Sequence, residues 1–349
     1  MAEDVYAVSG TAGACRLPVL HIERASITDD FLDGICEGPG APGRLMRLAG
    51  PLGSGRTTLL EDMAHIAEGE GWRAIKVSGT EVLKDAVSGL GALPESSPDG
   101  CLPGRPVLRH LIEHVTANLS DEGRGLALLV DDAQEAKSDE LALLAECVQY
   151  EIREGHDIAL VLAGTRESML ACADGAGMGF LSRAKTEDLR TIPEDESAPA
   201  LEEALLAAGF ALEDGALPQL LDAAQGHAAL LQCIWRSLAS LPPGASITPE
   251  CARRCAAEAQ LKLSQKLLSG IDAPALELLS ALARNRKPQA LGSVRAELHM
   301  DEAEAASAAD ELKARQLLEE TAPGCLALAH PCLGSYLLKH AGRLYSASS

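Results

Sequence analysis

The sequence predicts an α/β protein with a parallel sheet, followed by a helical segment and a small C-terminal module. Between about residues 45 and 165, short apolar runs alternate with helical periodicity, which is typical of a parallel sheet with crossover helices. Beyond about residue 195 the chain is rich in Leu and Ala at helical spacing. Apolar residues make up 47% of the 349, enough for packed cores, and aromatic residues only 3%. A chain this long is too large for a single hydrophobic core, so we expect domains at 1–195, 196–269 and 270–349.

Strands in the first domain are expected where four to six apolar or alternating residues follow one another. These segments are 45–49, 74–77, 126–130 and 158–163. The unbroken apolar run at 126–130 is typical of a strand that is covered on both faces. One helix is expected around 59–67 and another after Pro106, since proline is favourable at the first helical position. Ser138 is expected to cap the helix that follows the third strand.

The last 80 residues predict a compact module of helices and one hairpin. Three helices are expected first, and then strands at 317–321 and 325–329 that turn at Pro323 and Gly324. Residues 88–106 hold Gly, Pro and Ser without periodicity and are expected to form an exposed loop.

The first strand ends in a glycine-rich segment with the composition of a phosphate-binding loop. Glycines let successive backbone N–H groups converge on phosphate oxygens, and the N-terminus of the following helix favours an anion. The spacing Gly-x-x-x-x-Gly-cation-Thr is intact, and the alternative is an ordinary glycine-rich turn. We expect the nucleotide to be bound by Gly50, Gly53, Ser54, Gly55, Arg56, Thr57 and Thr58.

Arg56 stands where such loops usually carry lysine. Its charge is retained, but a wide planar fork cannot reproduce the point contact that an ammonium makes between β- and γ-phosphates. We therefore expect Arg56 to contact phosphate and catalysis to be impaired.

Two carboxylates follow the strand at 126–130. Asp131 is placed to hold Mg²⁺ together with the Thr57 hydroxyl, because it ends a buried strand near the phosphate loop. Asp132 takes the position of the glutamate that usually polarises the attacking water, but it is one methylene shorter. The alternative is that both aspartates simply begin a turn.

Two further polar residues are candidates for contacts with the nucleotide. Thr165 follows the strand at 158–163, where it could sense the γ-phosphate, although hydroxyls are common at strand ends. Arg183 is either a phosphate contact made in trans or a solvated helix residue.

Charge and cysteine pattern exclude several classes of protein. The net charge of −21 excludes a general binder of nucleic-acid backbones. No apolar run reaches the roughly 18–20 residues of a membrane span, and the acidic start lacks the features of a signal peptide. The ten cysteines contain no Cys-x-x-Cys pair and suit a reducing compartment. We expect a cytoplasmic protein with no membrane partner.

Together, several segments resemble bacterial AAA ATPases of the origin-recognition-like type, a group allied to the STAND class. They are 37–44, the phosphate loop, the strand ending in Asp131 and Asp132, 148–153 and 180–184. The resemblance covers most of the chain and implies a P-loop NTPase sheet, a helical lid, a C-terminal winged helix, and ATP with Mg²⁺ as cofactors. Family members carry Gly-x-Pro in the lid near the nucleotide, where this chain has Gly226, His227 and Ala228.

From residue 262 onward the chain is electrically neutral, with ten Lys and Arg against ten Asp and Glu. In a winged helix, the helix that begins at 301 would be the recognition helix, and it opens with Asp301, Glu302 and Glu304. Carboxylates there repel phosphates, so we expect DNA binding to be weak. Packing or binding of a protein partner, including self-association, is the favoured role.

Because Arg56, Asp132 and Ala228 all depart from the family pattern, we predict an ATP- or ADP-binding regulatory switch with weak or slow Mg²⁺-dependent hydrolysis. Two alternatives remain open. One is a non-enzymatic winged-helix transcriptional or interaction protein with a vestigial nucleotide site. The other is a fully active ATPase.

Overall fold

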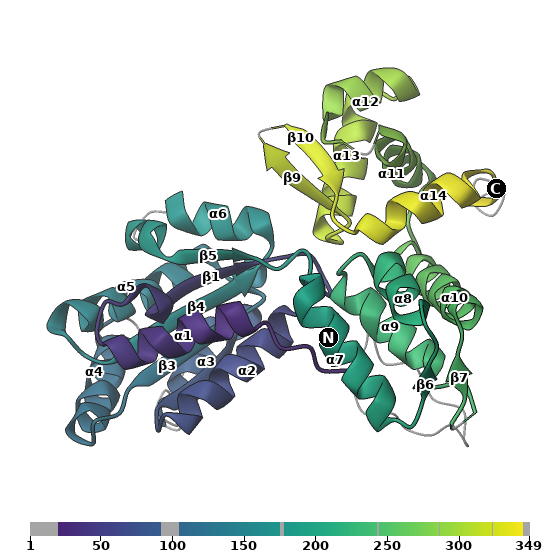
Figure 1. Ribbon diagram of the computed structural model, residues 1–349. Coiled ribbons are helices and arrows are strands. Elements are labelled where there is room, and N and C mark those ends of the chain that lie inside the picture. The colour runs from purple at the N-terminus through teal and green to yellow at the C-terminus, as the bar shows by residue number, and fades with distance from the viewer. Residues whose placement is uncertain are drawn as a thin grey trace. The chain divides into compact units, whose positions relative to one another are not determined.

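The computed structural model describes residues 20–91, 105–174, 178–242, 244–285, 287–322 and 324–344. The chain divides into two compact units (Figure 1). One is Glu23–Leu189, and the other consists of the described residues before and after that range. The expected loop at 88–106 lies largely outside the described residues, although Ser88 and Gly89 already belong to a helix.

The first unit is built on a five-stranded sheet in the order β2-β3-β4-β1-β5, in which all neighbours are parallel. Its strands are β1 (Leu45–Ala49), β2 (Arg73–Ser78), β3 (Leu126–Asp131), β4 (Ile158–Gly164) and β5 (Lys185–Asp188). The predicted α/β class is confirmed. Since every strand runs the same way, the loops that follow β1, β3 and β4 leave one edge of the sheet, and β4 lies between β1 and β3.

Helices cover both faces of this sheet (Figure 1). They are α1 (Ala25–Glu37), α2 (Arg56–Gly69), α3 (Val82–Gly89), α4 (Arg105–Asp121), α5 (Ser138–Glu154) and α6 (Arg166–Asp174), with short 3₁₀ turns η2 (Pro42–Arg44), η3 (Gly79–Glu81), η4 (Ala133–Glu135) and η5 (Gly179–Arg183). Ala127 and Leu129 of β3 pack in one core cluster with α1 and α2. Leu128 and its even-numbered neighbours pack in another with α3 to α6. Successive side chains of a strand point to opposite faces, which explains the unbroken apolar run.

Three features of the strands and caps differ from the expectations. β5 was not expected, because its sequence Lys-Thr-Glu-Asp is polar and the strand lies at the sheet edge, where side chains alternate between half-buried and exposed. The segment after residue 195, expected to be helical until the C-terminal module, also holds two short strands, since β6 (Ala211–Leu212) and β7 (Ser246–Ile247) form a parallel pair. Ser138 does not cap α5. It is the first helical residue, and Lys137 precedes it without a side-chain cap.

The second unit is mainly helical. Its helices are α7 (Glu194–Ala207), α8 (Ala216–Ala224), α9 (Ala228–Leu238), α10 (Pro249–Leu267), α11 (Ala273–Asn285), α12 (Leu291–Leu298), α13 (Glu302–Ala314) and α14 (Pro331–Leu344). The strands β8 (Gln289–Ala290), β9 (Leu318–Ala322) and β10 (Cys325–Leu328) form an antiparallel sheet in the order β8-β10-β9. The predicted three helices and hairpin are therefore present, and Pro323 of the expected turn lies outside the described residues. Helix α14 was not expected.

A buried pair of histidines joins two segments of the second unit. His227 Nε2 lies 2.9 Å from His330 Nδ1, and the Leu230 backbone N–H donates to His227 Nδ1 at the start of α9. His227 therefore carries its hydrogen on Nε2 and donates it to His330. Burial lowers the pKa of His227 to about 4 and that of His330 to about 3, so both rings are neutral at pH 7.

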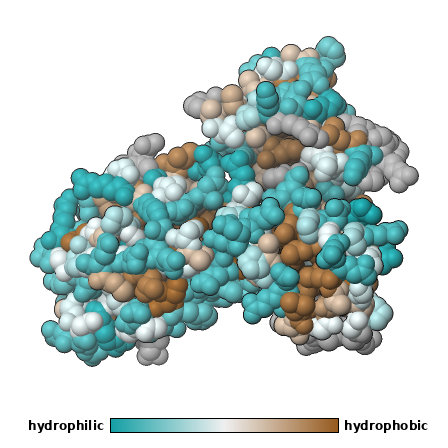
Figure 2. Space-filling view, in the orientation of Figure 1, coloured by the Kyte–Doolittle hydropathy of each residue, from teal (hydrophilic) through white to brown (hydrophobic). Residues whose placement is uncertain are grey.

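Few large apolar side chains are exposed among the residues that the structure describes. Figure 2 shows one face that is mostly hydrophilic, with brown areas separated from one another. Among the described residues, the exposed large apolar side chains lie on five different helices: Val107, Leu170, Leu206, Leu261 and Leu338. No described helix combines the length and the hydropathy that a membrane crossing requires.

Candidate functional site

The glycine-rich segment lies between β1 and α2 and has the backbone of a phosphate-binding loop. Gly53 and Gly55 have φ of 75° and 92°, left-handed conformations that other residues adopt only with strain. Helix α2 begins at Arg56, so its first backbone N–H groups, which have no partner inside the helix, face the loop. Ser54 Oγ is buried without a hydrogen-bond partner in the part of the chain that the structure describes. The loop therefore offers several donors to an anion.

Arg24, just before α1, binds the backbone of this loop. Its Nη2 donates to the backbone oxygens of Ser54 at 2.9 Å and Leu189 at 3.0 Å, and only 5% of the residue is exposed. Sequence analysis missed Arg24, because its partners are backbone carbonyls 30 and 165 positions away and no periodicity marks such a contact.

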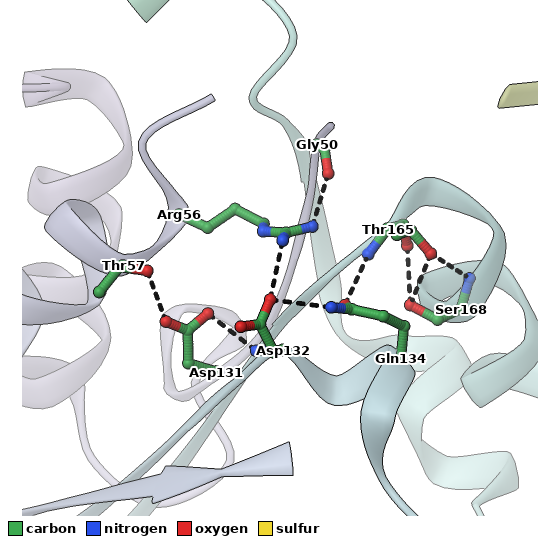
Figure 3. Close-up of polar contacts among 8 residues, drawn as sticks. All are labelled: Gly50, Arg56, Thr57, Asp131, Asp132, Gln134, Thr165 and Ser168. Atoms are coloured by element: carbon green, nitrogen blue, oxygen red, sulfur yellow. Dashed lines mark hydrogen bonds and ion pairs between the residues drawn. The ribbon is translucent and has the colours of Figure 1, made fainter. Parts of the chain in front are cut away.

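Thr57 and Asp131 lie side by side as predicted (Figure 3). Thr57, in the first turn of α2, donates through Oγ1 to Asp131 Oδ2 at 2.6 Å. The other oxygen, Oδ1, accepts from the Asp132 backbone N–H at 2.8 Å. A hydroxyl and a carboxylate beside a phosphate loop form the oxygen donor set that suits Mg²⁺, so these residues fit that ion.

Arg56 takes a position that sequence analysis did not anticipate. Its side chain is 5% exposed, with Nη1 donating to the Gly50 carbonyl and Nη2 to Asp132 Oδ1, both at 2.8 Å (Figure 3). The cation of the phosphate loop is thus paired with the carboxylate at the position where the attacking water is usually polarised. Asp132 is thus shorter than the usual glutamate, and its Oδ1 is held by Arg56.

The backbone of Asp132 is also unusual. Its φ of 47° lies in the left-handed region, where a non-glycine residue is uncommon. Gly79, directly after β2, approaches it so closely that a Cβ there would lie 2.0 Å from the Asp132 carbonyl oxygen. The close approach of these two loops therefore requires glycine at position 79.

Gln134 connects Asp132 to the end of β4. Its Nε2 donates to Asp132 Oδ1 at 2.8 Å, and its Oε1 accepts from the Thr165 backbone N–H at 3.3 Å. The Thr165 hydroxyl, the candidate sensor of the γ-phosphate, contacts Ser168 Oγ at 3.2 Å and accepts from the Ser168 N–H at 3.3 Å at the start of α6. The structure brings Thr165 near Asp132 through Gln134, which sequence analysis missed.

The sequence also singled out Thr58, Arg183 and His227. Thr58 is exposed in the first turn of α2, and Arg183 is exposed at the end of η5. His227 belongs to the second unit, where it caps α9 and contacts His330.

Comparison with known proteins agrees with this fold. Residues 42–169 match the family model of an AAA domain. No curated protein matches the chain significantly. Similar solved structures include the Walker-type ATPase PABY2304 of Pyrococcus abyssi (14% identity, TM-score 0.62, covering 96% of this chain and 99% of that one).

Two further similar structures are an ORC2 protein and a Cdc6p protein. ORC2 of Aeropyrum pernix in its ADP form is 15% identical, with a TM-score of 0.55, covering 99% of this chain and 98% of that one. Cdc6p of Pyrobaculum aerophilum is 18% identical, with a TM-score of 0.52, covering 97% and 98%. At these identities the likeness establishes a shared fold.

Proposed function

We propose that this chain, whose residues 42–169 form an AAA domain with the P-loop ATPase fold, is a nucleotide-dependent regulatory switch that binds ATP and ADP with Mg²⁺ and hydrolyses ATP slowly. One observation carries this proposal. The phosphate loop keeps the groups that bind, whereas its cation Arg56 is paired with Asp132, the candidate water-activating carboxylate.

Binding is supported by the loop backbone and by the oxygen pair beside it. The N–H groups at the start of α2 and the buried Ser54 hydroxyl are available to phosphate oxygens. Thr57 and Asp131 would hold Mg²⁺, which when bound neutralises charge on the phosphates.

Slow turnover is supported by the contacts of Asp132. Oδ1 of Asp132 already accepts from Arg56 Nη2 and Gln134 Nε2, which fixes the position of the carboxylate and leaves only Oδ2 to act as a general base toward the water. Arg56, in turn, must share its guanidinium between a carboxylate and a phosphate.

We extend the proposal to the second unit, with 196–269 as the lid and 270–349 as a winged helix. The order helix, strand, helix, helix and hairpin from α11 to β10 supports the second assignment. Glu302 and Glu304, exposed at the start of α13, favour a protein partner or self-association over strong DNA binding. Nucleotide shifts such a switch only through different affinities for its states. Cytoplasmic location is part of this proposal.

Calorimetric titration of the purified protein with ATP and with ADP, each with Mg²⁺ and with a chelator, tests binding. We expect both nucleotides to bind and Mg²⁺ to strengthen ATP binding. A phosphate-release assay should then give turnover below about 1 s⁻¹, the low end of ordinary enzymes. Absence of binding would favour the non-enzymatic interaction protein, and rapid release would favour the fully active ATPase.

A further inference from the structure

A continuous chain of polar contacts runs from the phosphate loop to the first turn of α6 (Figure 3). It passes from Arg56 through Asp132 and Gln134 to Thr165, and ends at Ser168. Gln134, in the η4 turn after β3, is the only side chain of this network that contacts both Asp132 and the end of β4 among the described residues.

The orientation of the Gln134 amide follows from its neighbours. The ionised Asp132 carboxylate only accepts hydrogen bonds, and the Thr165 backbone N–H only donates. A single orientation of the amide therefore serves both, with nitrogen toward Asp132 and oxygen toward Thr165. The opposite orientation would place oxygen against oxygen and N–H against N–H. Because one rigid amide makes both contacts, a shift of Asp132 that moves the amide also changes its contact with Thr165.

A third phosphate would disturb this network at one point. The cation of a phosphate loop reaches the β- and γ-phosphates, so a γ-phosphate competes with Asp132 for the Arg56 guanidinium. When Arg56 turns to the phosphate, the Asp132 carboxylate loses one of its two side-chain donors and retains Gln134 Nε2. A carboxylate left with no donor would make that opening much less favourable.

We propose that Gln134 is a positioning residue that lets this site favour the nucleoside triphosphate over the diphosphate, by holding Asp132 when Arg56 turns to the third phosphate. Through Oε1, the same residue passes the movement of Asp132 to Thr165 and the start of α6. This inference rests on the proposed nucleotide binding, but it concerns the ratio of two affinities rather than binding itself.

The test compares ATP and ADP affinities of the full chain by calorimetry. Gln134→Met keeps the length of the side chain and removes both contacts. Gln134→Glu keeps the acceptor for Thr165 but places a second carboxylate against Asp132. We expect ATP affinity to fall about tenfold or more in both variants, the effect of losing a hydrogen bond to a charged group. ADP affinity should stay within about twofold. The matched control is Glu135→Gln, an exposed residue of the same turn, which should leave both affinities unchanged.

A double-mutant cycle makes the outcome specific to the Asp132 charge. In an Asp132→Asn background, Gln134→Met should leave the ratio of ATP to ADP affinity unchanged, because no carboxylate has to be held. Thermal melting identifies any variant that does not fold. If Gln134→Met does not fold, the affinities of Gln134→Glu alone test the inference. An equal loss of ATP and ADP affinity, or an unchanged ratio in both single variants, overturns the inference while nucleotide binding stands. A wild-type protein that binds neither nucleotide overturns the proposed function itself.

Discussion

Arg56 Nη2 lies 2.8 Å from Asp132 Oδ1, so the cation of the phosphate loop is paired with the carboxylate that directly follows β3. Only 5% of the arginine side chain is exposed, compared with 32% of the aspartate side chain. A buried charge requires a partner, and here the partner is the carboxylate that we propose as the water-activating group. Under the proposed function, nucleotide binding and ATP hydrolysis therefore make opposing demands on this one contact.

Arg56→Ala should weaken ATP binding at least about tenfold, because a charged hydrogen-bond donor to phosphate is lost and the Asp132 charge is left near the phosphates. The fold should remain, since the loop backbone is also held by Arg24. Calorimetry measures the affinity and thermal melting the fold, with Arg153→Ala on the exposed side of α5 as control. Equal affinities in wild type and Arg56→Ala, or no binding by either, would contradict the phosphate-loop assignment.

The double variant Arg56→Lys, Asp132→Glu should hydrolyse ATP faster than the wild type. Lysine lacks the fork that holds both Gly50 and the carboxylate, and glutamate reaches one methylene further. A well-placed general base contributes about 10²–10⁴-fold, so this is the upper bound of the gain. Phosphate release measures it, and a fast wild-type enzyme that these changes slow would refute the idea of an impaired site.

Removal of the Thr57 hydroxyl should abolish the effect of Mg²⁺ on nucleotide affinity. Thr57→Val keeps the shape of the side chain, but it loses the oxygen that lies 2.6 Å from Asp131 Oδ2. We expect wild-type protein to bind ATP more tightly with Mg²⁺ than with a chelator, and Thr57→Val to bind equally in both. Ser120→Ala, which removes an exposed hydroxyl on α4, is the control. A full Mg²⁺ effect in Thr57→Val would exclude Thr57 as a ligand.

The histidine pair should make the stability of the protein depend on pH. The pKa values of His227 and His330, lowered to about 4 and about 3, lie below the 6.5 of an unfolded histidine. The unfolded chain therefore binds more protons, and the pair's contribution is complete above about pH 6.5 and decreases as pH falls toward 4. The slope is up to ~1.4 kcal/mol per pH unit for each histidine.

Thermal melting between pH 7.5 and 5 measures this slope. The variant His227→Asn, His330→Leu keeps an acceptor for the Leu230 N–H at the helix cap and should flatten the curve. The exposed His65→Gln on α2 should leave it unchanged. If the double variant melts with the same pH dependence as the wild type, the pair does not carry this contribution.

Duplex DNA should bind weakly to the wild-type protein, because the exposed first turn of α13 is acidic. Charge reversal in Glu302→Lys, Glu304→Lys should strengthen non-specific binding and steepen its salt dependence if α13 faces DNA. The same changes should reduce stability by about 0.3–1 kcal/mol each, since anions are favoured at a helix N-terminus. DNA affinity measured over a series of salt concentrations shows whether α13 faces DNA. Tight, sequence-specific DNA binding by the wild type at physiological salt would contradict the proposal that residues 270–349 bind a protein partner.

Local sequence determined the framework of the site. Apolar runs such as 126–130 specify strands buried on both faces, since every residue of such a strand needs a packing partner. The glycine spacing predicted where the chain turns into α2, because Gly53 and Gly55 adopt conformations that other residues avoid. Parallel strand ends share one edge, so the meeting of Thr57 and Asp131 also followed.

Only the tertiary structure decided how the charged groups are paired. Arg56 and Asp132 are 76 positions apart, and Gln134 and Thr165 are 31 apart. Their contacts depend on the order in which β4 comes between β1 and β3, on the left-handed backbone of Asp132, and on the close approach of Gly79. Hydrophobic periodicity shows which face of a helix or strand is buried, because the spacing of apolar residues along the chain marks that face directly. Which polar atoms meet depends on strand order and backbone conformation across the whole sheet, and no local pattern carries that information.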